Sequence, residues 1–88
     1  MPTNHRSKPP IQRPQPRLDV EPLKQFVARR LNVEVVNRVQ FAVALGVRRT
    51  TTFPWDRTGV PLYMADRMAV RLGVHPTEIW GDAFYQAA

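Results

Sequence analysis

The chain has 88 residues, no cysteine and 43% apolar residues, which allows one small domain with a modest core and excludes disulfides and thiolate chemistry. Its 13 lysines and arginines outnumber its 7 acidic residues, and the resulting formal net charge of +6 favours acidic partners such as nucleic acids. No apolar run is long enough to span a membrane or to form a signal peptide, so we expect a cytoplasmic protein with no membrane contact.

The first 18 residues differ in composition from the rest of the chain. They contain five of the nine prolines and four basic residues, but no acidic residue. A segment with so little apolar surface cannot offset the entropy that is lost on ordering. Residues 1–18 are therefore predicted to be a disordered, basic, Pro-rich arm, and residues 19–88 to be the folded domain.

Apolar residues recur at helical spacing after Asp19, which is the expected N-cap of a helix that reaches about Asn32. A second helix is predicted over residues 35–45. A short strand over residues 33–36 is the alternative, because valine lowers helix propensity. The face of the second helix that turns to the core is expected to comprise Val35, Val39, Ala42 and Val43.

A third helix is predicted to begin at Pro61, whose ring fits the first helical turn, and to end at Gly73. A last short helix is expected over residues 76–80. Strict apolar–polar alternation, the pattern of a half-buried strand, is absent. The sequence therefore predicts an all-α fold, a small bundle of four or five helices.

A short repeat marks two helix ends. Residues 42–50 read AVALGVRRT and residues 69–77 read AVRLGVHPT. In each copy a helix ends in leucine, a glycine can take the left-handed conformation, and a valine returns to the core. The repeat therefore predicts left-handed helix ends at Gly46 and Gly73.

The first copy also fits the pattern of a helix-turn-helix. Such a motif needs a small residue opposite the turn, a glycine in the turn and apolar residues beside it. Ala42 and Gly46 occupy the first two places, and Phe41, Leu45 and Val47 the apolar ones. Trp55 follows as an expected core residue. These positions predict a helix-turn-helix over about residues 38–57.

Residues 41–80 resemble small lambda-repressor-like helix-turn-helix proteins of actinobacteria and their phages. The resemblance implies a compact helical bundle, a repressor or Cro-like regulator that is often dimeric, and a recognition helix across residues 48–57. The residues that carry it are Ala42, Leu45, Gly46, Val47, Arg49, Trp55, Gly59 to Tyr63, Ala65 to Arg67, Ala69, Val70 and Leu72 to Trp80.

Pro54 interrupts this expected recognition helix, because proline lacks an N–H and clashes with the preceding turn. Two arrangements reconcile it with the motif. In one, the helix begins late, with Thr52 or Phe53 as its cap and Pro54 in its first turn, and residues 48–51 form an extended loop. In the other, the helix is short and kinked.

The function predicted from these features is a DNA-binding transcriptional regulator whose helix-turn-helix enters the major groove of double-stranded DNA. Arginines would contact phosphates and guanine edges, and the basic arm would follow the backbone. Whether the protein forms a homodimer stays open. The predicted contact residues are Arg38, Arg48, Arg49, Thr50, Thr51 and Arg57 in the domain, and Arg13 and Arg17 in the arm.

Two alternatives stay open. One is an excisionase-like architectural factor that bends DNA. The other is a phage-type protein-interaction module that binds a host regulator or polymerase, with Trp80, Phe84 and Tyr85 as its exposed apolar surface.

Catalysis is not expected. The sequence contains no nucleophile–histidine set, no Gly-rich phosphate loop and no pair of carboxylates at a suggestive spacing. No cofactor, metal or small-molecule substrate is therefore predicted. His75 precedes a proline at a helix start, and we interpret it as an N-cap instead of a metal ligand.

Overall fold

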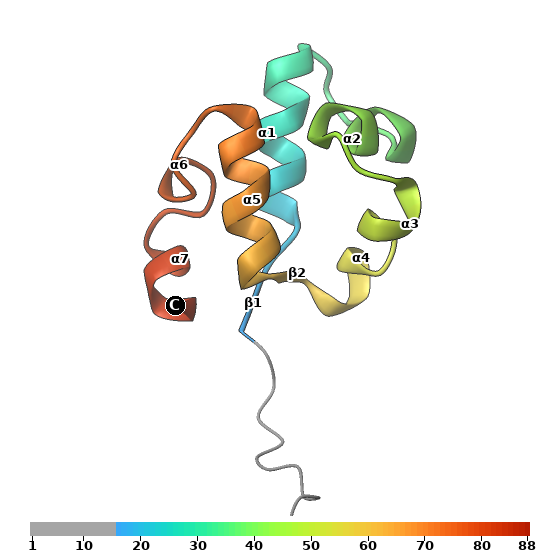
Figure 1. Ribbon diagram of the computed structural model, residues 1–88. Helices are drawn as coiled ribbons and strands as arrows, with labels where there is room; N and C mark the ends of the chain where they lie inside the picture. Colours follow the sequence, from blue (N-terminus) through green and yellow to red (C-terminus); the bar gives the residue numbers. More distant parts are fainter. Residues whose placement is uncertain (1–15) are drawn as a thin grey trace, which may run out of the picture.

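The computed structural model describes residues 16–88, and this part of the chain is mostly helical, as the sequence predicts (Figure 1). Two short strands accompany the helices. The elements in chain order are β1 (Arg17–Leu18), α1 (Glu21–Leu31), α2 (Arg38–Leu45), α3 (Arg49–Thr52), α4 (Trp55–Thr58), β2 (Val60–Pro61), α5 (Leu62–Leu72), α6 (Thr77–Trp80) and α7 (Asp82–Ala87).

Helices α1 and α5 occupy the middle of the fold, with α2, α3 and α4 on one side and α6 and α7 on the other (Figure 1). A hydrogen bond from Arg30 of α1 to the Leu72 carbonyl of α5, 3.0 Å long, links the central pair. The apolar core draws side chains from both sides. It contains Leu18, Val20, Leu23, Val27, Phe41, Leu45, Trp55, Val60, Met64, Ala65, Met68, Ala69, Leu72, Ile79 and Trp80.

Strand β1 corrects the predicted end of the arm. It pairs antiparallel with β2, with Arg17 opposite Pro61 and Leu18 opposite Val60. The side chain of Leu18 is only 4% exposed, so it belongs to the core. The domain therefore starts before residue 19, because backbone pairing and burial stabilise a segment that composition alone marks as unstructured. The rest of the predicted arm, residues 1–15, lies outside the described residues.

Helix α1 begins at Glu21 with Val20 as its N-cap, one residue after the predicted cap Asp19, whose carboxylate accepts the Glu21 N–H at 2.9 Å. Helix α2 begins three residues later than predicted, at Arg38, because Asn37 and Gln40 cap each other's backbone N–H groups. The alternative strand over residues 33–36 is not formed.

The predicted buried face of the second helix is confirmed for Ala42 and wrong for its three valines. Val35, Val39 and Val43 are exposed, and the helix packs on the core through Phe41, Ala42 and Leu45. A helix with apolar residues on both sides buries the face that carries its larger side chains. Valine spacing alone does not reveal this choice.

The repeated helix ends are confirmed. Gly46 and Gly73 both have left-handed backbones, with φ of 71° and 76°. In each copy the following valine donates its N–H five residues back: Val47 to Ala42 at 3.1 Å, and Val74 to Ala69 at 3.0 Å. In each copy the glycine N–H also donates, Gly46 to Val43 at 3.1 Å and Gly73 to Val70 at 3.0 Å, and the two bonds together form a Schellman-type cap.

The C-terminal part confirms α6 and adds α7, which the sequence reading did not predict. Trp80 is 6% exposed, and its indole N–H donates to the Asp19 carbonyl at 2.8 Å. Trp80 therefore belongs to the core. The interaction-module alternative is wrong on this residue, because it placed Trp80 on an exposed surface. The N-cap of α6 is Pro76 and not the predicted His75, although the His75 ring still bonds the start of the helix, because its Nδ1 accepts the Thr77 N–H at 3.2 Å.

Candidate nucleic-acid interface

The turn between α2 and α3 is fixed from outside by α5. The last carbonyl groups of a helix have no partner within the helix. Here the Arg71 guanidinium supplies one, because Nη1 donates to the Gly46 oxygen at 2.6 Å and to the Leu45 oxygen at 3.3 Å. Sequence reasoning missed this contact, since no local signal pairs residues 25 positions apart.

Two short helices replace the single recognition helix predicted over residues 48–57. Helix α3 has four residues, α4 has four, and Phe53 and Pro54 separate them. Pro54 has no N–H to donate to the Thr50 carbonyl, and its own carbonyl accepts from the Arg57 and Thr58 N–H groups at 3.0 and 2.9 Å. The extended loop predicted over residues 48–51 is therefore wrong, because residues 49–52 are helical. A helix does begin late, at Trp55 directly after Pro54, so the segment is a short helix that is interrupted and then resumed.

Buried side chains anchor this segment from within. Trp55 is buried and meets Phe41 of α2 edge to face, with ring centroids 6.4 Å apart. Thr52 is also buried, and its hydroxyl donates to the Arg49 carbonyl at 3.0 Å. These contacts leave the start of α3 facing outward.

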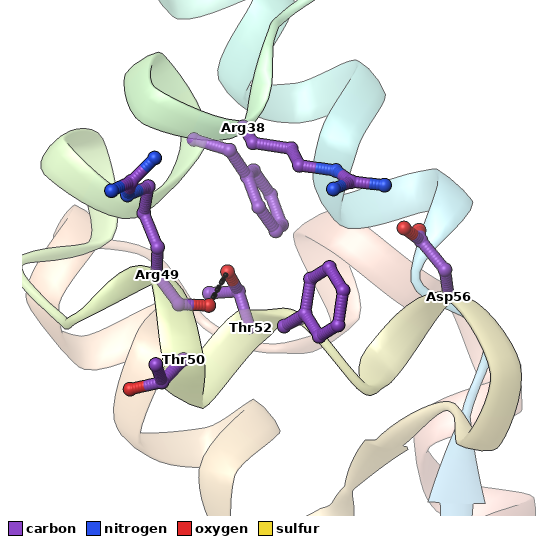
Figure 2. A pocket seen from close by; sticks show the side chains of 7 residues that line it. Arg38, Arg49, Thr50, Thr52 and Asp56 are labelled. Carbon is purple, nitrogen blue, oxygen red and sulfur yellow. Dashed lines mark hydrogen bonds between the residues drawn. The ribbon is translucent and has the colours of Figure 1, made fainter.

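A pocket of roughly 300 Å³ lies between α2 and α3 (Figure 2). The guanidinium carbon of Arg38 stands 4.9 Å from the centre of the Phe53 ring, within cation–π range. Figure 2 shows Arg38 and Asp56 on one side of the pocket and Arg49 and Thr50 on the other. The complete lining is Arg38, Phe41, Arg49, Thr50, Thr52, Phe53 and Asp56.

The cations on this side of the molecule have few internal partners. Within residues 16–88, the side chains of Arg48, Arg49 and Arg57 are exposed and make neither a hydrogen bond nor an ion pair. The one carboxylate of the pocket lining, Asp56, is paired with Lys24 at 2.5 Å. The arginines therefore face solvent, and the nearby negative charge is already compensated.

Five of the eight predicted contact residues fall into two groups. The pocket brings together Arg38, Arg49 and Thr50. Arg17 and Arg57 line a second depression, between β1 and α4, where Arg17 reaches the Gly59 carbonyl at 3.4 Å.

The other predicted contacts have different positions. Arg48 is the extended residue before α3, and Thr51 is half-buried in α3 with its N–H bonded to the Arg48 carbonyl at 3.0 Å. Arg13 lies outside the described residues. The structure places Phe53, which was not among the predicted contacts, in the pocket, 58% exposed.

Comparison of the chain with protein-family models, curated proteins and solved structures finds no match. No helix in residues 16–88 has the length and apolarity needed to cross a membrane. Over the same residues no three His, Cys, Asp or Glu side chains gather in a way that could hold a metal ion.

Proposed function

We propose that this protein is a DNA-binding regulator whose α2–turn–α3 unit acts as a helix-turn-helix. The observation that carries the proposal is the exposed, internally unpaired state of Arg48 and Arg49, directly after a turn that is closed by Gly46 and braced by Arg71. Exposed arginines suit phosphate and guanine contacts, because their donors are free to pair with DNA. The braced turn fixes the backbone that carries them.

In the proposed complex, the start of α3 enters the major groove and α2 crosses the backbone. Arg48 and Arg49 contact phosphates or the O6 and N7 atoms of guanine, while Arg38 at the start of α2 contacts backbone. Arg17 and Arg57 extend the positive surface along the neighbouring phosphates. Because α3 has only four residues, base reading is confined to a single helical turn.

The test is selection of duplexes from a random pool, followed by measurement of the affinity of the selected duplex and of a scrambled one at two salt concentrations. We expect selective binding and an affinity that falls steeply with salt, since each neutralised phosphate releases counterions. Equal, weak binding of both duplexes would contradict a regulator that reads sequence.

A second candidate function is protein interaction, with a second copy of the chain or a host regulator or polymerase as the partner. The observation that favours it is the pair Val39 and Val43, which stand one turn apart on the outer face of α2 and are 52% and 72% exposed. Sedimentation of the free protein tests for a homodimer. Replacement of both valines by serine would then dissociate that dimer.

A further inference from the structure

We propose that Phe53 also reads a base at this interface and that it contacts the 5-methyl group of thymine in the major groove. The inference rests on the proposed DNA binding and names what the site recognises. Phe53 is 58% exposed and lines the same pocket as Arg38 and Arg49.

The position of Phe53 places it on the DNA-facing side of α3. Its N–H donates to the Arg49 carbonyl at 2.9 Å, so Phe53 stands one helical turn after Arg49. Residues four apart share a helix face. A pose that directs Arg49 into the groove therefore directs Phe53 there as well.

The chemistry around Phe53 fits a base edge with an apolar group. Its ring cannot bind phosphate, and the wall of the pocket behind it is formed by buried Phe41 and Thr52. Arg38 stacks over the ring and Arg49 lies beside it, which supplies positive charge for the flanking phosphates. Thymine is the one base that presents a methyl group in the major groove.

The stacked guanidinium also fixes the orientation of the ring. An exposed phenylalanine that rotates freely loses entropy on binding, whereas one held by a cation–π contact loses less. Arg38 is thus a positioning residue for Phe53 in addition to any phosphate contact of its own.

The test compares two alternating duplexes of equal length, dA–dT and dA–dU. They have the same charges and the same minor-groove groups, and differ only in the 5-methyl group. Burial of one methyl is worth about 0.8 kcal/mol, so we expect the wild-type protein to bind dA–dT about fourfold more tightly than dA–dU. We expect Phe53→Ala to bind the two duplexes equally.

The control is Tyr63→Ala, which removes an equally exposed aromatic side chain from α5 and should keep the fourfold preference. Thermal melting of both variants checks that the fold is intact. A wild-type protein that binds dA–dT and dA–dU with one affinity overturns the inference while DNA binding stands.

Two other outcomes also overturn it. Loss of DNA bending in Phe53→Ala, with no thymine preference in the wild type, would identify Phe53 as a wedge of an architectural protein. Absence of any DNA affinity, even at low salt, would overturn both the inference and the proposed function.

Discussion

Arg71 and Gly46 connect two parts of the molecule that are 25 residues apart in sequence. The guanidinium of Arg71, on α5, donates to the Gly46 carbonyl at the end of α2, and the distance is 2.6 Å. Through this contact the long central helix holds the turn that aims α3. The orientation of the proposed DNA-binding segment therefore depends on a residue outside the helix-turn-helix.

We expect Arg71→Ala to lower the free energy of unfolding by about 1 kcal/mol, because the Gly46 and Leu45 carbonyls would then have no charged donor near the surface. DNA affinity should fall further than stability predicts, since the turn is no longer braced. Arg67→Ala is the matched control, because Arg67 is also exposed on α5 and its side chain has no polar partner within the described chain. Equal melting temperatures and affinities for the two variants would rule out the bracing role.

The two glycine helix ends should respond differently to alanine. Both have left-handed backbones, which cost a residue with a Cβ about 1–2 kcal/mol. A Cβ on Gly73 would meet nothing within 4 Å, whereas one on Gly46 would lie 2.5 Å from Arg71 Nη1 and displace it. We expect Gly46→Ala to destabilise the protein by about 1 kcal/mol more than Gly73→Ala in chemical denaturation.

The same pair provides an internal check on the cause of that difference. In an Arg71→Ala background the clash disappears, so Gly46→Ala and Gly73→Ala should cost about the same. A difference that persists without Arg71 would place the cause elsewhere in the turn.

Arg48→Ala and Arg49→Ala should each weaken DNA binding by about 1–3 kcal/mol and leave the melting temperature unchanged. Both side chains are exposed and have no polar partner within residues 16–88, so their removal disturbs no internal hydrogen bond or ion pair. The salt dependence of the association constant should also fall by about one unit for each phosphate that the variant no longer neutralises. If both variants bind DNA with the parent's affinity at low salt, the proposed interface is wrong.

Pro54→Ala should raise stability by about 1 kcal/mol and join α3 to α4. Phe53 has helical dihedrals, φ −53° and ψ −48°, which a following proline disfavours, and alanine restores an N–H for the Thr50 carbonyl. The unfolded chain of the variant has more conformational entropy than the parent's, and this offsets part of the gain in stability.

The effect of Pro54→Ala on DNA separates the two candidate functions. If the interrupted segment reads DNA, straightening it rotates Phe53 and Arg57 and should reduce selectivity. Unchanged binding of selected and scrambled duplexes would favour the protein-interaction module. Circular dichroism would show whether the two helices have joined.

Two truncations locate the start of the domain. Removal of residues 1–15 keeps β1, whereas removal of residues 1–18 deletes Leu18, whose burial is worth about 1.5–3 kcal/mol. We expect the longer truncation to be less stable by at least that amount in urea titrations. Both should bind DNA with a smaller salt dependence, because residues 1–15 include Arg6, Lys8 and Arg13. Equal stability of the two truncated proteins would contradict the role assigned to β1.

Much of the candidate site follows from nearby residues. The break at Pro54 depends on the missing N–H of one residue, and the exposure of Arg48 and Arg49 follows from their place just after a helix end. The exposure of Phe53 does not follow from nearby residues, because an apolar aromatic residue at this position fits the core equally well. The structure shows that Trp55 packs against Phe41 in the core and that Phe53 stays outside it.

The helical character of the domain and the left-handed helix ends at Gly46 and Gly73 follow from the amino-acid sequence without knowledge of the fold. A left-handed residue such as Gly46 or Gly73 acts on the turn in which it stands, so its effect can be deduced from a few neighbouring residues. Packing of the whole chain settles which face of α2 is buried, that Leu18 closes a strand pair against Val60, and that Arg71 braces the turn. Each of these features depends on groups that are far apart in the chain and meet only after the helices pack. Local residue preferences do not identify such partners.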